Sequence, residues 1–413
     1  MKILVSAYGC EPYKGSESGV GWNWVKRMAI KHELWVITRA NNQSQISLCK
    51  EEWVHSVHWI YYDLPPFIRK LKRGDKGLYF YYFLWQLGIL KKAKRLQAEI
   101  SFDCVWHLSF GSMWMPTFLY KLPIPFIWGP IGGGESIPRS YWPLLTKKNA
   151  FTQWIRQIMI KTAMLNPFFA IPAKRATVIL VRTEDSRKVF PSKMNTKIFT
   201  SLETCMEEDT LLRYQKKETA IHNKQPLRCI YTGRLIPLKA LEITIRAIAK
   251  MKHKEQITFT IVGKGALKKP LADLCKELGV GRQVHFVEYM PREELLAILE
   301  KQDLFVFPSL KEGGSWALME AMAVGLAPIC HDLSGMHLIT SEESAWRIKA
   351  DGIEKSIQQF AEVMDYCVEH PQEVAEKGKA AHERIACDFV WQSKDAVIED
   401  VLTRVRIRKC EQV

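Results

Sequence analysis

The feature that most constrains the fold is a repeated alternation of short apolar runs with helix-length segments. In the first half the runs are KILVSAY, ELWVITRA, VHWIYYD, FDCVWHL, PFIWGP and ATVILVRT; in the second they are RCIYTGR, ITFTIVG, QVHFVEY, LFVFPS and LAPICHD. Several are apolar throughout and rich in Val, Ile and Phe, which is typical of parallel strands buried on both faces. Strand–helix alternation therefore predicts doubly wound parallel sheets of the α/β class.

This alternation is interrupted once, by the polar and charged stretch from Ser201 to Gln225, and it restarts with a strand at Arg228. A chain of 413 residues also exceeds the size at which a single core usually divides. We therefore expect two Rossmann-like domains, residues 1–203 and 204–388, joined at this stretch.

Charge is distributed unevenly along the chain, whose formal net charge is +15. Residues 136–183 contain no acid, and residues 65–95 form a second basic, aromatic-rich segment. Such segments suit anionic surfaces such as lipid head groups or nucleic acid, and the alternative is an ordinary solvated helix face. The basic residues of the acid-free stretch are Arg139, Lys147, Lys148, Arg156, Lys161, Lys174, Arg175 and Arg182.

Membrane contact is predicted to be peripheral at most. The longest apolar stretch, residues 77–90, falls short of the roughly 20 residues that a spanning helix needs. The apolar run at the start is too short for a signal peptide. Apolar residues at helical spacing within the acid-free stretch could enter the head-group region, or could instead pack on the sheet. They are Phe151, Trp154, Ile155, Ile158 and Met159.

The ten cysteines include no CxxC pair and no metal-ligand spacing. This pattern favours reduced thiols in a cytoplasmic protein over a disulfide framework. We expect neither a metal nor a resident cofactor, because the sequence also contains no Asp-x-Asp motif.

Glycines and basic residues collect where the expected strands of the second half end. In open parallel sheets, ligands bind at the carboxyl ends of the strands. Helix N-termini bind anions, glycine allows close approach, and Arg and Lys add charge-assisted contacts. Together these turns predict a diphosphate site, although each alone could be structural. The residues are Gly233, Arg234 and Lys239, then Gly263, Lys264 and Gly265, then Lys311 to Ser315.

Two carboxylates, Glu312 and Glu320, accompany the third turn. An unpaired buried carboxylate costs several kcal/mol, so each needs a partner or a function. Glu320 lies about a turn and a half into the helix expected to start near Ser315, where it can reach a ribose diol. Glu312 precedes the helix and can face the next group of the ligand. The alternative is an ion pair between Glu320 and a buried Arg or Lys of its own domain.

At this point the segments GRLIPLK, IVGKG and EGGSWALME resemble, in order and spacing, the C-terminal domain of family 4 glycosyltransferases. These are retaining, nucleotide-sugar-dependent enzymes of the GT-B fold, in which two Rossmann-like domains face each other across a cleft. The resemblance covers about residues 228–335. It includes the signature of two Glu separated by seven residues, met by Glu312 and Glu320.

The first half is more divergent but contains three further likenesses. GCEPYKGSESGVGW, with Gly15, Ser16 and Gly19, resembles the family's glycine-rich first loop, and WHLSFG, with His107, resembles its loop after the fourth strand. WGPIGGGESIP, with Gly133 and Glu135, looks like a motif of a bacterial polysaccharide-assembly subgroup, although this glycine run could equally be a hinge or tight turn. The last segment, residues 389–413, resembles the family's terminal helix, which crosses back to the N-terminal domain.

The resemblance implies a role for each matched residue. Glu320 would hold the ribose, Arg234 and Lys239 would neutralise the diphosphate, and Glu312 would contact the donor sugar. His107 would touch the sugar from the other domain, although a single histidine near a strand end is often structural. Gly314 stands where the family usually has an aromatic residue, which leaves the donor sugar open, and Ala240 replaces a common glycine. The remaining donor contacts would come from Gly233, Gly263, Gly265, Gly313, Gly314 and Ser315.

The resemblance thus implies a retaining transfer from a nucleotide diphosphate sugar to a glycan or lipid-linked acceptor in cell-surface polysaccharide synthesis. The N-terminal domain would bind the acceptor, at the inner face of the plasma membrane. No residue is clearly placed as a general base, and in this family the departing phosphate can take the proton. The partners expected are a nucleotide sugar, the acceptor and an anionic membrane surface, but no nucleic acid.

Three alternatives remain open from the sequence. A nucleotide-sugar epimerase of the same fold would need catalytic acids in the crevice of the N-terminal domain. An NAD-dependent dehydrogenase would need an early GxGxxG, whose spacing the first loop lacks. A basic nucleic-acid-binding protein would show affinity that falls steeply with salt, and it would leave the ordered Gly, Arg and Glu set unexplained.

Overall fold

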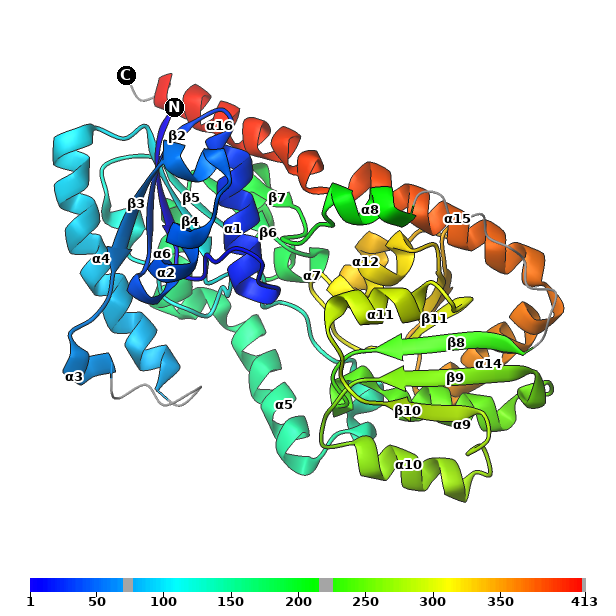
Figure 1. Cartoon of the computed structure of the whole chain (residues 1–413). Coiled ribbons are helices and arrows are strands. Elements are labelled where there is room, and N and C mark those ends of the chain that lie inside the picture. The colour runs from blue at the N-terminus through cyan, green and yellow to red at the C-terminus, as the bar shows by residue number, and fades with distance from the viewer. Residues whose placement is uncertain (70–76, 215–225, 411–413) are drawn as a thin grey trace. The chain divides into compact units, whose positions relative to one another are not determined.

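The computed structural model describes residues 1–69, 77–214 and 226–410, which form two compact units (Figure 1). The first unit contains residues 1–134, 159–203 and 391–413, and the second contains residues 135–158 and 204–390. Each unit is built on a parallel sheet, so the predicted doubly wound α/β class is confirmed. Residues 135–158, which the sequence placed with the N-terminal domain, group with the second unit.

The sheet of the first unit has seven parallel strands in the order β3-β2-β1-β4-β5-β6-β7. Every strand expected from the apolar runs forms, and all except the edge strand β3 are largely buried. β7 was not anticipated, since three residues are too few to stand out as an apolar run. The strands are β1 (Lys2–Ala7), β2 (Glu33–Arg39), β3 (Val57–Tyr62), β4 (Cys104–Ser109), β5 (Phe126–Ile131), β6 (Val178–Val181) and β7 (Ile198–Thr200).

Helices cover both faces of this sheet. α1 and α16 contact each other and the strands on one face, while α4 and α6 bury Trp85, Ile89 and Phe169 against the other. Figure 1 shows α1 and α16 on one side of the strands and α4 on the other. The helices are α1 (Ser16–Ala29), α2 (Gln43–Leu48), α3 (Pro66–Arg69), α4 (Leu78–Ile100), α6 (Pro167–Arg175), α7 (Glu184–Arg187) and α16 (Lys394–Cys410), and α5 (Lys147–Lys161) spans the two units.

The sheet of the second unit has six parallel strands in the order β10-β9-β8-β11-β12-β13. Its short outer strand β13 was again not anticipated. Strands β9, β8 and β11 are therefore direct neighbours, which determines how the loops that follow them meet. The strands are β8 (Leu227–Thr232), β9 (Ile257–Val262), β10 (Val284–Val287), β11 (Leu304–Phe307), β12 (Ala327–His331) and β13 (Trp346–Ile348).

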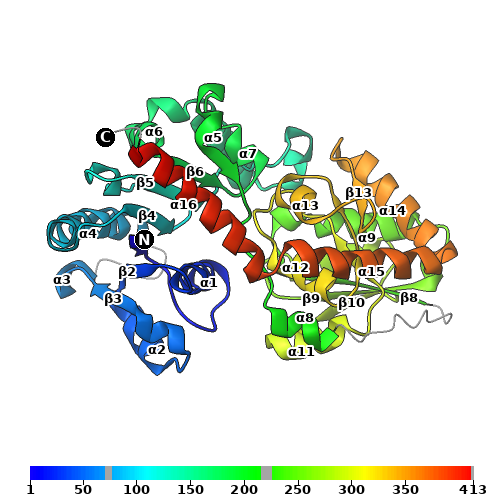
Figure 2. The same cartoon turned by 90° about the horizontal axis from the view of Figure 1, so that it is seen from above.

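Two helical layers enclose the second sheet (Figures 1 and 2). α9 packs on α10 and α14 on one face, and α12 packs on α8 and α15 on the other. The helices are α8 (Glu208–Tyr214), α9 (Leu241–Lys250), α10 (Lys268–Glu277), α11 (Arg292–Leu299), α12 (Trp316–Ala323), α13 (Ser334–Ile339), α14 (Ile353–Glu369) and α15 (Pro371–Asp388). Across the described ranges, no helix combines the length and apolar character needed to cross a bilayer.

Tyr141 attaches the segment 135–158 to the rest of the second unit. Its side chain is completely buried, and its hydroxyl lies 2.6 Å from the Ser356 hydroxyl on α14. The backbone N–H of Gly352 donates to the same phenol oxygen at 3.3 Å. The Tyr141 ring also meets the His331 ring edge-on, with centroids 5.5 Å apart. Packing and hydrogen bonding therefore both hold this segment against the helix that follows β13.

We predict that Tyr141→Phe lowers the free energy of unfolding of the second unit by about 1–3 kcal/mol, because Ser356 and Gly352 lose a buried partner. Tyr366→Phe is the matched control, since its hydroxyl bonds Glu373 at the surface, and it should change stability by less than about 0.5 kcal/mol. Urea unfolding followed by hydrogen exchange in peptides of the second unit measures both. Equal effects would show that the Tyr141 hydroxyl does not anchor the segment.

Candidate functional site

The three loops singled out from the sequence lie side by side at the carboxyl edge of the second sheet, because they follow the adjacent strands β9, β8 and β11. Backbone hydrogen bonds join them. Gly233 N–H donates to Val262 O and Leu235 N–H to Lys264 O, each at 3.0 Å. Leu310 N–H donates to Leu238 O, also at 3.0 Å. The structure thus brings together the residues predicted to bind a diphosphate.

Three of the predicted glycines are required by their backbone conformation or by close backbone packing. Gly233 and Gly263 have φ of +146° and +153°, a conformation that side-chain-bearing residues rarely adopt. A Cβ on Gly263 would lie 1.9 Å from the Gly233 carbonyl oxygen, and one on Gly265 would lie 2.2 Å from that of Leu235. The glycines therefore let the two loops approach each other, whether or not a phosphate is bound.

Glu312 is partly neutralised by its neighbours. Its Oε1 accepts from the Lys239 ammonium and from the Ser309 hydroxyl. The same ammonium lies 4.9 Å from the centre of the Phe307 ring, so it is bounded by a carboxylate and an aromatic face. Oε2 of Glu312 has no partner among the described residues. Lys239, predicted as a diphosphate ligand, is thus engaged in an ion pair, and Glu312 keeps one acceptor oxygen available.

Glu320 is only 8% exposed and lies in α12, whose first turn is capped by Ser315. The Ser315 hydroxyl accepts from Leu318 N–H at 3.4 Å. Oε1 of Glu320 receives the Arg292 Nε–H at 2.5 Å, and Arg292 is 45% exposed. Glu320 therefore forms an ion pair within its own unit, as in the alternative interpretation, but its partner is a partly exposed arginine rather than a buried one. Oε2 again has no partner in the ranges that the structure describes.

Arg234 differs from the paired Lys239. Its side chain is exposed and forms no ion pair with any described residue. Its backbone is held, because Tyr231 donates its hydroxyl to the Arg234 carbonyl at 3.1 Å. Lys264 in the neighbouring loop lies 4.9 Å from the centre of the Tyr289 ring. Arg234 therefore has no carboxylate partner among the described residues, and the same holds for Lys264, which contacts an aromatic ring instead.

Thr204, which the sequence analysis did not single out, explains the unusual glycine at position 314. A Cβ on Gly314 would lie 2.0 Å from the Thr204 Oγ1. The aromatic residue expected there has no room in this conformation. Gly335 is equally confined, because its Cβ would lie 1.6 Å from the Gly313 carbonyl oxygen. Its N–H donates to the Glu312 carbonyl at 3.2 Å, which joins α13 to the loop that holds Glu312.

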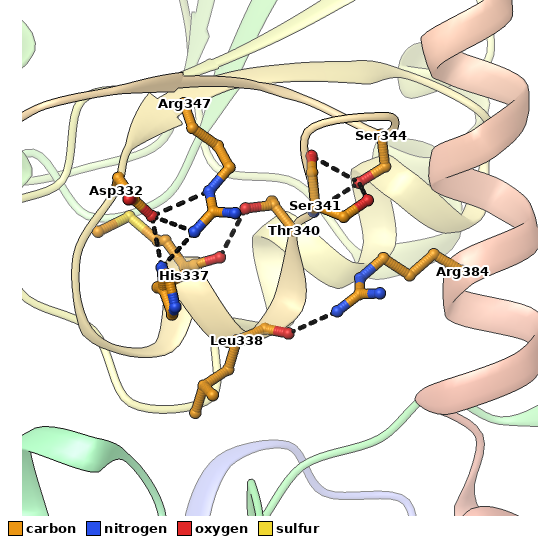
Figure 3. A network of polar contacts seen from close by, with 9 residues as sticks. Asp332, His337, Leu338, Thr340, Ser341, Ser344, Arg347 and Arg384 are labelled. Carbon is orange, nitrogen blue, oxygen red and sulfur yellow. Dashed lines mark hydrogen bonds and ion pairs between the residues drawn. The ribbon is translucent and has the colours of Figure 1, made fainter.

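A polar network fixes the segment that contains Gly335 (Figure 3). Asp332, directly after β12, accepts from Arg347 Nε at 2.9 Å and bonds His337 Nδ1 at 2.7 Å. Burial opposes ionisation of this carboxyl, but the hydrogen bonds from His337 and Arg347 lower its pKa below the usual value. Arg384 of α15 donates to the Leu338 carbonyl at 3.0 Å. These contacts tie α13 to β13 and α15.

A series of buried hydrogen bonds connects Gly352 with Pro308, which directly follows β11 and precedes the loop that holds Glu312. Burial lowers the pKa of His331 to about 4, so the ring is neutral. Its Nδ1 lies 3.0 Å from the Pro308 carbonyl and its Nε2 2.9 Å from the Ser356 hydroxyl. A carbonyl can only accept and the Gly352 N–H can only donate, so every proton is assigned. Gly352 donates to Tyr141, Tyr141 to Ser356, Ser356 to His331 Nε2, and His331 Nδ1 to Pro308.

Lys311, which begins the third predicted loop beside Glu312, is a further cation of this region. Burial, reinforced by the positive charge of Arg156, lowers the pKa of Lys311 to about 8. Glu135 and Glu312 oppose this shift. Arg156 Nε donates to the Glu135 carbonyl at 2.8 Å. Glu135, predicted as a loop residue of the N-terminal domain, therefore belongs to a charged cluster of the second unit.

Of the predicted residues of the first unit, His107, Gly19 and Gly133 lie in tightly packed surroundings, whereas no atom lies within 4 Å of a Cβ built on Gly15. His107 is buried within β4, where burial lowers its pKa to about 4. Gly15 precedes α1, and a Cβ on Gly19 would lie 2.0 Å from the Lys14 carbonyl oxygen. Gly133 has φ of +140° and would place a Cβ 2.6 Å from the Trp114 Nε1. The Ser16 side chain lies outside the described residues, although α1 begins there.

Arg182 had been counted with the exposed basic residues, but it is an internal residue of the first unit. Its guanidinium donates to the Gly111 carbonyl at 2.6 Å and lies 3.2 Å from a Glu203 carboxylate oxygen. Glu17, 3.8 Å from the same guanidinium, accepts from Gly111 N–H at 2.6 Å. The charge of Arg182 therefore holds the loop after β4, a pairing that no local sequence pattern indicates.

The second unit matches a known family. Residues 214–384 match the family model described as Glycosyl transferases group 1. Amylovoran biosynthesis glycosyltransferase AmsK of Erwinia amylovora is 35% identical over 139 residues, which is 32% of this chain and 34% of that relative. The match thus spans about a third of the relative's length.

Two solved structures resemble nearly the whole chain. HepE of Anabaena in complex with UDP is 14% identical with a TM-score of 0.61, covering 98% of this chain and 100% of that one. Sucrose-phosphate synthase from Thermosynechococcus elongatus is 15% identical with a TM-score of 0.64, covering 98% and 99%. At this level of sequence identity, the similarity shows only that the folds are alike. The two Rossmann-like units together with these likenesses show that the chain has the GT-B fold, as predicted.

We predict that Gly335→Ala weakens the binding of whichever nucleoside diphosphate the site takes up by about tenfold or more, the loss expected when one hydrogen bond to a charged group is broken. The added methyl meets backbone, so the loop that holds Glu312 must move. Gly281→Ala is the control, because no atom lies within 4 Å of its Cβ. Calorimetric titration with UDP, GDP and ADP measures the affinities. Unchanged affinity in Gly335→Ala would separate α13 from the binding site.

Proposed function

We propose that this chain is a retaining glycosyltransferase. It transfers a sugar from a nucleotide diphosphate sugar to a hydroxyl of a glycan or lipid-linked acceptor in cell-surface polysaccharide synthesis. The observation that carries the proposal is the convergence of three glycine-containing loops with an unpaired Arg234 and two half-engaged glutamates, Glu312 and Glu320, at one sheet edge. The match to Glycosyl transferases group 1 over residues 214–384 supports it.

The groups at this sheet edge that are free to bind a ligand suit a nucleoside diphosphate. Arg234 offers a charge to phosphate oxygens, and the capped N-terminus of α12 offers backbone N–H groups. Glu320 offers Oε2 as an acceptor for a ribose hydroxyl while Oε1 remains with Arg292. Solved structures of the similar HepE of Anabaena contain UDP and UDP-glucose, which supports this class of donor.

The proposed chemistry breaks the bond between the anomeric carbon and the β-phosphate oxygen and forms a bond to the acceptor oxygen. The acceptor proton passes to the departing phosphate. Negative charge grows on that phosphate, so preorganised cations lower the barrier. Arg234 serves this role directly, and Lys239, held by Glu312, adds positive potential nearby. Glu312 keeps Oε2 for a hydroxyl of the transferred sugar.

A basic and apolar helix surface supports contact with an anionic membrane. No residue of α5 is buried, and the five apolar residues predicted to share one face are all exposed. Phe151 and Trp154 stack with centroids 5.8 Å apart and are 60% and 47% exposed. Lys147, Lys148 and Lys161 are exposed on the same helix.

This surface is less basic than the sequence suggested. Arg182 is engaged with Gly111 and Glu203, Arg156 with Glu135 and Arg139 with Gln157, so three of the eight basic residues of the acid-free stretch have partners within the protein. Each remaining lysine near an anionic surface contributes about 1 kcal/mol, so three suffice for reversible attachment at the inner face of the plasma membrane. Such attachment would bring a lipid-linked acceptor within reach.

Arg234→Ala tests the transferase proposal. Incubation with UDP-, GDP-, ADP- and dTDP-sugars and a glycan panel should give transfer by the wild type, with the anomeric configuration retained. The variant should have a kcat lower by about a hundredfold, as for the loss of one oxyanion donor. Arg282→Ala, an exposed arginine before β10 and hence at the opposite sheet edge, should keep full activity. Isomerisation of free donor without acceptor would instead support an epimerase.

The membrane proposal is tested with vesicles. Wild type should bind phosphatidylglycerol vesicles more tightly than phosphatidylcholine vesicles, and less tightly as salt rises. Trp154→Ser combined with Ile158→Ser should lower this affinity about tenfold or more without affecting folding, because both side chains are exposed. Ile407→Ser, exposed on α16, is the control. Equal binding to both lipids, or binding to neither, would remove the membrane from the proposal.

A further inference from the structure

Arg39 occupies an unusual position in the first unit. It is the last residue of β2, so it lies at the carboxyl edge of the first sheet, where open parallel sheets bind ligands. The side chain is partly exposed, and its Nε is buried without a hydrogen-bond partner. Within the described ranges, no carboxylate forms an ion pair with Arg39. A guanidinium in this state lacks the compensation that buried charges usually have.

Aromatic rings hold this guanidinium in place. Its carbon lies 4.9 Å from the centre of the Tyr8 ring and 5.9 Å from that of Tyr81. Tyr8, directly after β1, meets the rings of Tyr82 and Trp85 at 5.1 Å and that of Phe110 at 5.7 Å. The Arg39 cluster, defined as Arg39, Tyr8, Tyr81 and Phe110, therefore joins the ends of β1, β2 and β4.

A carboxylate close to this cluster, that of Asp63, is used elsewhere. Asp63 follows β3, and its Oδ1 accepts from the Tyr81 hydroxyl and from Leu64 N–H. Burial and, after it, Asp63 raise the pKa of Tyr81, yet Asp63 forms no ion pair with Arg39. Asp63 thus fixes the ring that flanks the guanidinium and leaves the cation without an anion.

We propose that Arg39 binds an oxyanion of the acceptor, either a carboxylate of a uronic acid or a phosphate. This rests on the proposed transferase function and names the acceptor class that the first unit selects. Arginine matches both anions because its planar fork donates two parallel hydrogen bonds. The rings around it resemble the mostly apolar lining, with few placed polar groups, that is typical of small-molecule sites.

The experiment compares acceptors that differ only in charge. Matched oligosaccharides are offered as the neutral form, as the form with one uronate, and as the form with a phosphate at the reducing end or on a lipid. Wild type should transfer to one of the charged forms with a kcat/KM about tenfold or more above the neutral form. The form preferred identifies whether the oxyanion is a carboxylate or a phosphate.

Arg39→Gln should abolish this preference while leaving transfer to the neutral form and hydrolysis of the donor unchanged. Arg39→Lys should restore part of it, since the charge remains but the fork is lost. Arg175→Gln, an exposed arginine ending α6 before β6 and thus at the opposite sheet edge, is the control.

Two negative results have different meanings. The role of Arg39 would be overturned if the wild type cleaves the donor but transfers to charged and neutral acceptors at equal rates. It would also be overturned if Arg39→Gln lowers transfer to both acceptors by the same factor. Absence of donor cleavage with every acceptor would overturn the transferase proposal itself.

Discussion

The contact between Gly263 and Gly233 is the constraint on which the second-unit site depends. The loops that contain them follow two adjacent strands and contact each other through backbone atoms. The contact is so close that it leaves no space for a Cβ atom on Gly263. Parallel strands place their carboxyl ends at one edge, but only unsubstituted backbone lets the following loops close upon each other. The positions of Arg234 and of the Glu312 loop are therefore set by main-chain geometry before any side chain takes part.

The cations near the carboxyl edge of the second sheet are of two kinds, those paired with a carboxylate and those without such a partner. Lys239 is held by Glu312 and Arg292 by Glu320, so these pairs are balanced. Arg234 is exposed and unpaired among the described residues, and Arg39 in the first unit is unpaired as well. Cations paired with a carboxylate hold the loops in place, whereas unpaired cations mark the positions where a bound anion would be stabilised most. The contrast separates residues that shape the site from those that would act on a ligand, which a list of basic residues cannot do.

Much of the fold could be predicted because buried parallel strands produce long apolar runs, and the convergence of the three donor loops followed from their position at strand ends. β7 and β13 were missed since three residues produce no recognisable run. The contacts of Tyr141 with Ser356 and of Arg182 with Glu17 join residues far apart in the sequence, so no local spacing reveals them. The sequence also could not show that Lys239 is paired and Arg234 is not, because this depends on which side chains the fold brings within reach.

Thr204 and Gly314 couple two positions of this site. An aromatic residue at position 314 cannot be accommodated while the threonine hydroxyl lies 2.0 Å from where its Cβ would be. The threonine side chain must rotate, or give way to a smaller one, before position 314 can hold any side chain. A redesign of the loop that holds Glu312 must therefore treat positions 204 and 314 as a pair, because a change at one alters the space at the other.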